Sequence, residues 1–333
     1  MKKTLRIVGP IVAIIIITIA GYFIFMNFKQ REFRKNIQTY IPGIACWGDS
    51  LTYGAGGDGI SYPSILEQLL SESGIDIPVY NLGVGGESTL QIMARRGVYN
   101  IETSENITIP STTDPVQISL TIHTDTGYQP LAILRQGTAG VETVTISGIK
   151  GNLIIQQESI SSENYTYYFQ RKNAGHEKTV YAGSKLFLTG AQKYNNCIPI
   201  IFMGTNGIWS SPEDLVKQCQ NMLDCQYSLN SDRYLILGLT SGTADERKEL
   251  EEEMEKTFGK RYLNLREYLS GRGLEDAGIT PTEQDQEAMK KGVVPPSLRS
   301  DDIHLNKEGY TLIGKKIFER MNEIGYFDYK IKV

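Results

Sequence analysis

Short apolar runs that end in glycine-containing turns recur along this 333-residue chain. They lie at 44–47, 79–82 and 198–203, and a helical pattern follows the first two. Strands that alternate with helices favour a parallel sheet, because parallel neighbours need a crossover that a helix usually supplies. We therefore predict an α/β fold. The further elements predicted from the same patterns are a strand at 234–239 and helices at 62–73, 87–96, 186–194, 245–258 and 306–324.

The pattern changes between about residues 100 and 183, where short alternating segments replace strand and helix. The strand candidates there are 116–122, 144–146, 153–155 and 165–169. Short strands separated by Thr-, Gly- and Asn-rich breaks are typical of a small sandwich or barrel. We predict an all-β domain inserted into the α/β fold. Its aromatic residues are either core and edge-strand side chains or a sugar-stacking platform: Tyr165, Tyr167, Tyr168 and Phe169.

The N-terminus carries an uncharged segment from Ile7 to Phe28. At about 1.5 Å per residue it reaches roughly 33 Å, enough to cross a hydrocarbon core. It ends in bulky residues instead of a small-residue cleavage site, so we predict a retained transmembrane helix. Basic residues flank it on both sides and do not fix its orientation. We expect a single-pass protein of the cell membrane with its catalytic domain outside the cytoplasm. The predicted division is an anchor at 1–35, an α/β domain at 36–102 and 185–333, and the β insert at 103–184.

Ser50 and His304 are the candidate reactive residues. A serine hydroxyl is a weak nucleophile at neutral pH and needs an adjacent base, which a carboxylate in turn orients. Ser50 follows the first apolar run within Gly-Asp-Ser-Leu at 48–51, where a tight turn would expose its hydroxyl. Asp301 precedes His304 by three residues, so one turn of backbone can bring its carboxylate to the imidazole. These features predict a serine hydrolase.

Composition argues against several other classes. The net charge is -4 with no basic tract, which disfavours nucleic-acid binding. No Cys/His cluster indicates a metal, and no Gly-x-Gly-x-x-Gly with a following acidic residue indicates a dinucleotide, so we expect no cofactor. Cys46 and Cys197 lie in apolar runs, as buried free thiols do. The other histidines, His123 and His176, lie in the insert, which leaves His304 as the expected base.

Four segments carry a family resemblance. They are 48–51 with Ser50, 81–88 with Gly86, 204–207 with Asn206, and 301–304 with His304. Each lies at a predicted strand end or directly before a predicted helix, and they occur in the order of the four blocks of the SGNH hydrolases, also called GDSL esterases and lipases. The chain resembles this family over roughly 36–100 and 185–325, leaving the insert outside. No Gly-x-Ser-x-Gly is present, which argues against the α/β-hydrolase fold.

The resemblance implies a flavodoxin-like three-layer α/β/α fold and a Ser50-His304-Asp301 triad. It also implies an oxyanion hole made of the Ser50 and Gly86 backbone N–H groups and the Asn206 side-chain amide; such donors stabilise the charge that develops on the carbonyl oxygen. The chain departs from the family at Gly207, where an aspartate is usual, so the geometry of that loop is in question. We expect the neighbouring Asp49 to brace its turn instead of reacting.

The predicted anchor and insert favour an ester substrate on an extracellular or cell-envelope carbohydrate, such as an O-acetylated glycan. Three alternatives stay open from the sequence. A lipase or acyl-thioesterase would use the same residues, and so would an O-acyltransferase that prefers a glycan acceptor to water. A catalytically silent carbohydrate-binding protein on the hydrolase scaffold is the alternative outside enzymes.

Overall fold

The computed structural model describes residues 21–25, 42–124, 127–130, 143–157, 165–225 and 232–327. Of the predicted membrane span from Ile7 to Phe28, the segment 21–25 is described and is helical. The rest of the span lies outside the described residues. Within the described part of the chain, no helix combines the length and the apolar character needed to cross a membrane.

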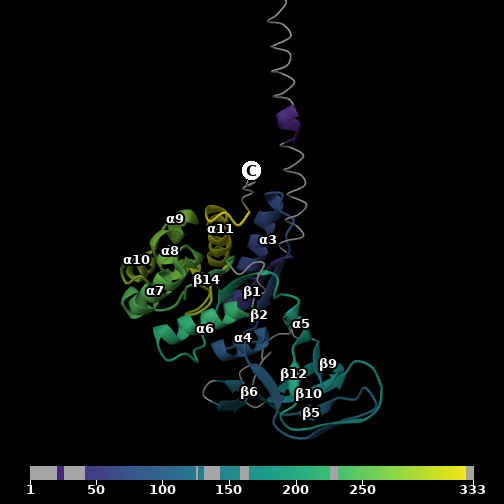
Figure 1. Cartoon of the computed structure of the whole chain (residues 1–333). Coiled ribbons are helices and arrows are strands. Elements are labelled where there is room, and N and C mark those ends of the chain that lie inside the picture. The colour runs from purple at the N-terminus through teal and green to yellow at the C-terminus, as the bar shows by residue number, and fades with distance from the viewer. Residues whose placement is uncertain are drawn as a thin grey trace, which may run out of the picture.

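A five-stranded parallel sheet forms the centre of the molecule (Figure 1). Its strands lie in the order β15-β14-β13-β1-β2. Their bounds are β1 Ile44–Gly48, β2 Val79–Gly83, β13 Ile198–Phe202, β14 Leu235–Leu237 and β15 Tyr262–Leu263. Every pairing in this sheet is parallel, which confirms the α/β prediction. The order is that of flavodoxin-like sheets, in which the first strand lies between the second and the third.

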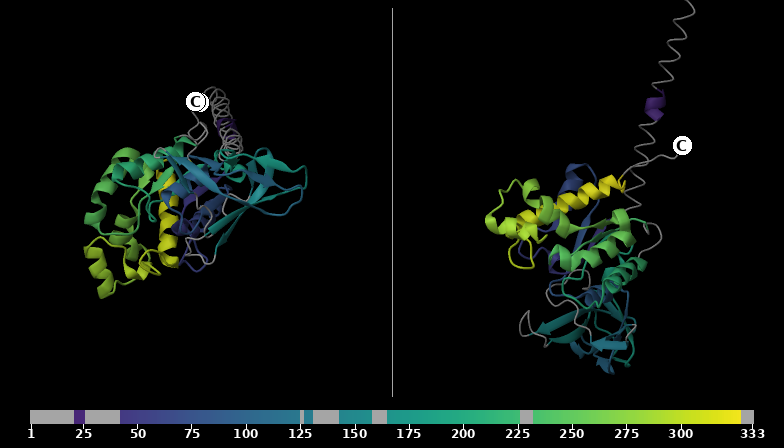
Figure 2. Two further views of the ribbon diagram at one scale, coloured as in Figure 1. Left: turned by 90° about the horizontal axis from the view of Figure 1, so that it is seen from below. Right: turned by 90° about the vertical axis from the view of Figure 1, so that its left-hand side faces the viewer.

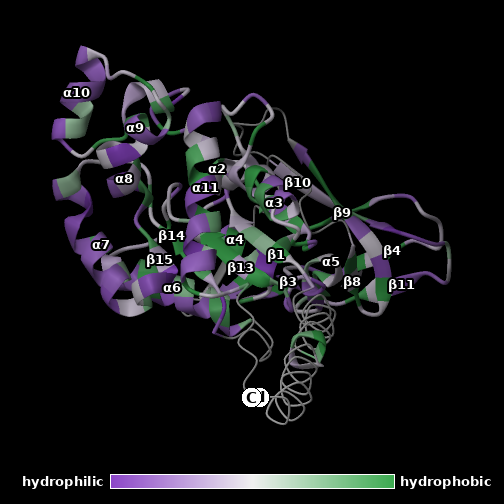
Figure 3. Cartoon of the chain, turned by 90° about the horizontal axis from the view of Figure 1, so that it is seen from above, coloured by the Kyte–Doolittle hydropathy of each residue, from purple (hydrophilic) through white to green (hydrophobic). Residues whose placement is uncertain are grey.

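Helices cover both faces of this sheet. Along β1, Ala45 and Trp47 face one hydrophobic core, and Ile44 and Cys46 face the other. The helices of the first core are α4 (Thr89–Arg96), α6 (Pro212–Asp224) and α7 (Ala244–Phe258), and those of the second include α3 (Tyr62–Glu72) and α11 (Lys307–Glu323). In Figure 3 the central strands are hydrophobic while α7 is mostly hydrophilic, as expected of an outer helix. The result is a three-layer α/β/α arrangement.

Local sequence explains where the longer helices begin. Ser61 caps α3, and Pro63 occupies its first turn, where a missing N–H costs nothing. Thr243 and Glu246 form a capping box at α7. Asn306 caps α11 through its Oδ1, which accepts from the Gly309 N–H. The shorter helical segments of this part are α8 Leu265–Tyr268, α9 Leu274–Asp276, α10 Glu283–Lys290, η2 Gly259–Arg261, η3 Leu269–Gly273 and η4 Pro296–Leu298.

A second, antiparallel sheet of eight strands extends from one end of the α/β part (Figures 1 and 2). Its order is β5-β10-β9-β8-β12-β3-β6-β7, beside a two-stranded ladder of β4 and β11. The strands are β3 Asn100–Thr103, β4 Ile107–Ile109, β5 Val116–Ile118, β6 Leu120–Thr124, β7 Gly127–Pro130, β8 Val144–Ile146, β9 Ile149–Gln157, β10 Tyr165–Arg171, β11 Lys178–Val180 and β12 Lys185–Phe187. Strand β3 crosses the predicted boundary at 103, and β12 begins directly after the predicted boundary at 184, so both flanking strands pair within this sheet.

The helix predicted over 186–194 is wrong. Strand β12 occupies Lys185–Phe187, and only the short α5 (Thr189–Gln192) follows. From Lys185 to Leu188 the residues are alternately exposed and buried, with Leu186 and Leu188 buried. This alternation is typical of a strand. Pairing with β3 and β8 on either side fixes this strand, and such non-local partners cannot be seen in a short apolar segment.

Two details of the cores bear on the sequence predictions. Tyr167 and Phe169 of β10 are buried, so these two rings are core residues and not an exposed platform. None of the four cysteines forms a disulfide, and Cys46, Cys197 and Cys219 are buried, as predicted for the first two. Burial raises the pKa of the Cys219 thiol to about 12, so this sulfur stays protonated.

Candidate active site

Ser50 opens a single helical turn, α2 (Ser50–Tyr53), directly after β1. The Asp49 side chain caps this turn by accepting from the Leu51 N–H at 2.9 Å, and Gly54 ends it in a left-handed conformation. The turn packs against the end of β2, where a Cβ on Gly83 would collide with the Tyr53 backbone nitrogen. Glycine at 83 is therefore needed for the two segments to approach. This packing fixes the position of the Ser50 hydroxyl.

His304 lies in the loop before α11, and that loop is held by its own hydrogen bonds. An isolated bridge joins Arg299 to Leu305, and the Ser300 N–H donates to the His304 carbonyl at 2.9 Å. The Asp301 Oδ1 accepts from the backbone N–H groups of Ile303 at 2.8 Å and His304 at 2.7 Å. One carboxylate oxygen thus shapes the turn, which leaves the other oxygen for the ring.

The structure brings Ser50, His304 and Asp301 together. The His304 Nε2 lies 2.9 Å from the Ser50 Oγ, and its Nδ1 lies 2.8 Å from the Asp301 Oδ2. Burial acts to raise the pKa of the Asp301 carboxyl, but hydrogen bonds from His304 and Ile303 outweigh it and lower this pKa to about 2. An ionised carboxylate can only accept, so Nδ1 carries the ring proton and Nε2 is free to accept from the serine.

Three neighbouring strands deliver the predicted site residues to one edge of the sheet. Ser50, Gly86 and Asn206 follow the carboxyl ends of β1, β2 and β13, which are paired in register at Gly48, Gly83 and Phe202. The strand that follows β1 in this sheet, β2, lies on one side of it, and the later strands β13, β14 and β15 lie on the other side. The order in which the chain adds strands therefore reverses between β1 and β13. Ligands of open α/β sheets bind at this kind of switch point, outside the carboxyl ends of the strands.

The predicted oxyanion residues lie on two loops that contact each other. The Asn206 Nδ2 donates to the carbonyl of Glu87, the residue after Gly86, at 2.9 Å. Gly86 has a φ of +75°, a conformation that suits glycine. Gly207, which stands where the resembled family has aspartate, also has a φ of +75°, and its carbonyl accepts from the Thr89 N–H at 3.3 Å. The departure from the family pattern therefore matches a left-handed turn that joins this loop to α4.

A buried ion pair lies beside the carboxyl ends of β1 and β2. The Arg95 Nε donates to the Glu87 Oε2 at 2.8 Å, and both side chains are fully buried. The same guanidinium donates to the carbonyls of Leu82 and Gly48, at 2.8 Å and 3.3 Å. Arg95 therefore ties the ends of β1 and β2 to the segment that follows Gly86. This role could not be predicted, because Arg95 falls in an ordinary amphipathic helix pattern.

Asp49 is fully buried beside the reactive serine. Its Oδ1 accepts from the Leu51 N–H, while its Oδ2 has no hydrogen-bond partner within the described part of the chain. Burial raises the pKa of the Asp49 carboxyl from 3.8 to about 7, although the Leu51 N–H and nearby His304 act to lower it. Near neutral pH this group is therefore partly protonated. Its contact with Leu51 agrees with the predicted bracing role.

The Asp49→Asn variant is expected to be more stable than the wild type at pH 8 and equally stable at pH 4. A raised pKa means that the folded state binds the proton more tightly than the unfolded chain. This tighter proton binding stabilises the folded wild type. The stabilisation is full below pH 3.8 and is lost as the pH rises through about 7. At about 1.4 kcal/mol per pKa unit, the loss is of the order of 4 kcal/mol.

Urea unfolding of both proteins from pH 4 to pH 8 measures this difference. Asp76 is exposed, so Asp76→Asn is the matched control and should keep the wild-type pH dependence. Parallel unfolding free energies for wild type and Asp49→Asn across this range would contradict the assignment of a raised pKa to Asp49.

Three exposed apolar side chains lie close in sequence to the candidate site residues. Tyr53, Ile208 and Ile303 are exposed large hydrophobic residues, and each stands within three residues of Ser50, Asn206 or His304. Ile208 is also strained, since its φ is +64°, which is an outlier for a β-branched residue and costs on the order of 1–3 kcal/mol. The strained turn is held by two donors to the Ile208 carbonyl, the Thr89 hydroxyl at 2.8 Å and the Gln218 Nε2 at 3.0 Å.

The two other histidines of the chain belong to the β-rich part. Both of them, His123 and His176, are exposed. Across the described residues, no group of three or more His, Cys, Asp and Glu side chains is arranged to hold a metal ion. The residues near the site that the sequence patterns did not indicate are Arg95, Thr89, Ile208 and Gln218.

Comparison with known proteins gives a distant similarity. No protein-family model matches the chain, and no curated protein matches it. One similar solved structure is titled "Peptidoglycan O-acetylesterase in action, 5 min". It is 13% identical, the match covers 88% of this chain and 95% of the other, and the TM-score is 0.35. At this degree of similarity the function has to be inferred from the residues of this chain.

Proposed function

We propose that this protein is a serine esterase of the SGNH type that hydrolyses carboxylic esters. The observation that carries the proposal is the continuous hydrogen-bonded series from the Ser50 hydroxyl through both nitrogens of His304 to the Asp301 carboxylate. A nucleophile, its base and an orienting group within about 3 Å of one another are the arrangement that activates a serine. The contact between the Gly86 and Asn206 loops adds candidate donors for an oxyanion.

In the proposed acylation, the Ser50 Oγ forms a bond to the ester carbon while its proton passes to the His304 Nε2. The ionised Asp301 stabilises the imidazolium through Nδ1–H. The Ser50 and Gly86 N–H groups and the Asn206 amide stabilise the charge on the former carbonyl oxygen. The intermediate then expels the alcohol, which takes the proton from Nε2 and leaves an acyl-serine.

In the proposed deacylation, water takes the place of the alcohol. His304 removes a proton from the water, whose oxygen bonds to the acyl carbon. The second intermediate collapses by breaking the bond to the Ser50 Oγ, which regains its proton from Nε2. The products are the free acid and the resting enzyme, and no cofactor enters the cycle.

The substrate class that we propose is a short-chain ester, most specifically an O-acetyl group on an extracellular or cell-envelope carbohydrate. The predicted N-terminal span would hold the enzyme at the membrane as a single-pass protein, with its catalytic part outside the cytoplasm. The β-rich sheet beside the α/β part would add surface for a polymeric substrate. The carbohydrate part of the proposal is tested separately from the esterase part.

A panel of esters tests the proposal. Purified protein is assayed with p-nitrophenyl acetate, butyrate and octanoate, and with O-acetylated xylooligosaccharides and chitooligosaccharides. A serine-directed phosphonate probe is applied in parallel and its site is mapped by mass spectrometry. We expect acetate release from at least one acetylated oligosaccharide, a fall in kcat/KM from acetate to octanoate, and labelling at Ser50 of the folded protein alone.

The alternatives give different results in the same panel. Activity that rises steadily from acetate to octanoate would indicate a lipase or acyl-thioesterase. Acetyl transfer to added unacetylated oligosaccharide, in preference to water, would indicate an acyltransferase. Failure of the probe to label folded protein, together with no ester hydrolysis, would contradict an enzymatic role.

A further inference from the structure

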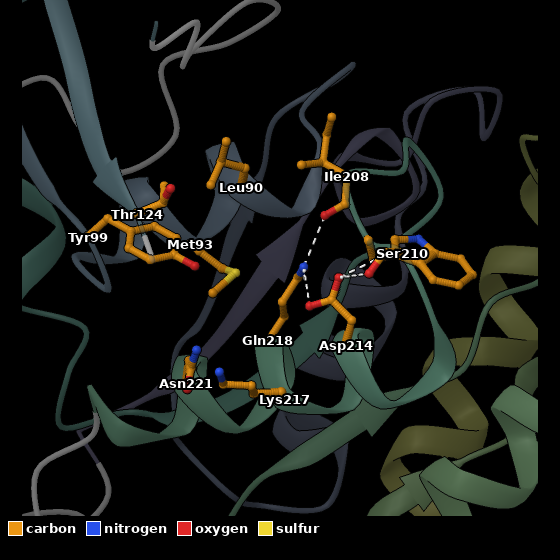
Figure 4. Close-up of a pocket in the computed structure, with 11 residues that line it drawn as sticks. Leu90, Met93, Tyr99, Thr124, Ile208, Ser210, Asp214, Lys217, Gln218 and Asn221 are labelled. Atoms are coloured by element: carbon orange, nitrogen blue, oxygen red, sulfur yellow. Dashed lines mark hydrogen bonds between the residues drawn. The ribbon is translucent and has the colours of Figure 1, made fainter. Parts of the chain in front are cut away.

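A pocket of about 430 Å³ lies between α4, α6 and the turn at Ile208–Ser210 (Figure 4). This volume falls within the range of about 300–1,000 Å³ that is usual for small-molecule sites. Two segments of its lining continue into the loops that carry Gly86 and Asn206. Leu90 on its wall is four residues beyond Gly86, and Ile208 on its rim is two residues beyond Asn206. Thr89 ties these two loops together by donating to Gly207 and Ile208.

The lining of the pocket combines apolar and polar groups. Leu90 and Met93 of α4 supply apolar surface, as do Ile208 and Trp209. Ser210, Asp214 and Gln218 supply polar groups (Figure 4). The Asp214 Oδ2 accepts from the N–H and hydroxyl of Ser210, and its Oδ1 accepts from Gln218. A carboxylate has about four acceptor positions, so these three bonds leave one for a ligand.

This mixture of groups favours a saccharide over a fatty acyl chain. A sugar ring presents C–H faces to an apolar wall and hydroxyls to carboxylate and amide groups. An alkyl chain would instead force the polar wall to give up water without any replacement hydrogen bond. Burial acts to raise the pKa of Asp214, but its bonds to Ser210 and Gln218 outweigh this and lower it below the ordinary value. Asp214 is therefore ionised near neutral pH, which an acyl chain would not tolerate well.

The strained Ile208 is a second, independent observation. The fold gains little from isoleucine at this position, because the side chain is 59% exposed and belongs to neither hydrophobic core. Glycine would adopt the observed φ without strain. The structure thus places an apolar residue at the rim of the pocket, two residues along the chain from Asn206, in a backbone conformation that isoleucine disfavours. Such an outlier points to a role in binding.

We infer that this pocket binds the carbohydrate part of the ester substrate and that Ile208 is one of its contact residues. The inference rests on the proposed esterase function and specifies where its substrate is held. If the inference is correct, filling the pocket lowers kcat/KM for a sugar ester more than kcat/KM for an ester that is too small to reach the pocket. The ratio of the two kcat/KM values is therefore the quantity to measure.

The experiment fills the pocket from α6 with Asn221→Trp, since Asn221 lies on the pocket wall. The matched control is Lys248→Trp, which adds the same ring to an exposed position of α7. The substrates are O-acetylated chitotetraose and p-nitrophenyl acetate. We expect the ratio of their kcat/KM values to fall at least tenfold in Asn221→Trp and to stay within twofold of wild type in Lys248→Trp.

Ile208→Gly keeps the inference testable if Asn221→Trp fails to fold. Relief of backbone strain should leave the melting temperature unchanged or higher, while the same kcat/KM ratio falls several-fold. A purely structural role for Ile208 would leave the ratio unchanged. In a Ser50→Ala background, Asn221→Trp should also weaken chitotetraose binding at least tenfold by calorimetry.

The outcomes separate this inference from the esterase proposal. An unchanged ratio in both Asn221→Trp and Ile208→Gly overturns the carbohydrate site while leaving the esterase intact. If the wild type hydrolyses p-nitrophenyl acetate but no acetylated oligosaccharide, the carbohydrate site is likewise overturned and the esterase proposal stands. A selective loss of p-nitrophenyl octanoate hydrolysis in Asn221→Trp would overturn it in favour of an acyl pocket. Hydrolysis of no ester at all would remove both proposals.

Discussion

Replacing Ser50 by alanine is expected to lower kcat for ester hydrolysis by about 10⁴- to 10⁶-fold, as loss of the nucleophile does in serine proteases. The Ser50 Oγ is the atom of this site that would bond to the acyl carbon, and no second hydroxyl is hydrogen-bonded to the His304 Nε2 among the described residues. The residual rate would come from the oxyanion donors and from substrate binding. Single-turnover and steady-state kinetics with p-nitrophenyl acetate measure the change.

The control for Ser50→Ala is Ser71→Ala, an exposed serine on α3, which should keep wild-type kcat. Ser50 is 8% exposed, and removal of its hydroxyl leaves the backbone contacts of α2 in place, so both variants should melt near the wild-type temperature. A folded Ser50→Ala protein that retained more than a hundredth of wild-type kcat would show that Ser50 is not the nucleophile.

The positions of the candidate reactive residues could be predicted because each belongs to a local pattern. Ser50 follows a run that is apolar enough to be a central strand, and His304 precedes a helix that begins at an asparagine cap. Both patterns depend on short stretches of sequence. Their convergence follows once a parallel sheet is assumed, because the carboxyl ends of parallel strands lie at one edge.

The remaining features depend on contacts between different segments of the chain, and no local sequence pattern predicts them. Strand β15 has two residues, which are too few to show any periodicity. It is defined by its parallel pairing with β14. The Ile208 turn with its positive φ is held by Thr89 of α4, 119 residues away in the chain, and by Gln218 of α6, ten residues away. Arg95 looks like a solvent-facing helix residue, yet Glu87 and two strand-end carbonyls surround it.

One arrangement connects the missed residues with the predicted ones. Arg95 fixes the ends of β1 and β2, and Thr89 joins the segment after β2 to the turn after β13. The Ser50 turn and the Asn206 loop are thereby positioned through buried groups that take no part in the proposed reaction. Such support matters because a displacement of about 1 Å at a catalytic group can cost about 10²-fold in rate.

Asp301→Asn is expected to lower kcat by about 10³- to 10⁴-fold, the effect of a wrong ring tautomer in a serine triad. An asparagine can keep the Oδ1 contacts with the Ile303 and His304 N–H groups, so the loop should hold its shape. Its amide would present N–H groups to Nδ1 and favour the tautomer whose proton is on Nε2. That nitrogen could then no longer accept the Ser50 proton.

The neighbouring Asp302 supplies the control, because its side chain is fully exposed and lies 3.8 Å from Arg299, outside the contacts to His304. Asp302→Asn should leave kcat within twofold of wild type. The Asp301 carboxyl itself is more than half exposed, with its pKa at about 2, so it stays ionised from pH 4 upward and adds no acid limb to the wild-type profile there. If Asp301→Asn and Asp302→Asn lost kcat equally, surface charge near His304 would explain the effect, and a specific role for the Asp301–His304 hydrogen bond would be excluded.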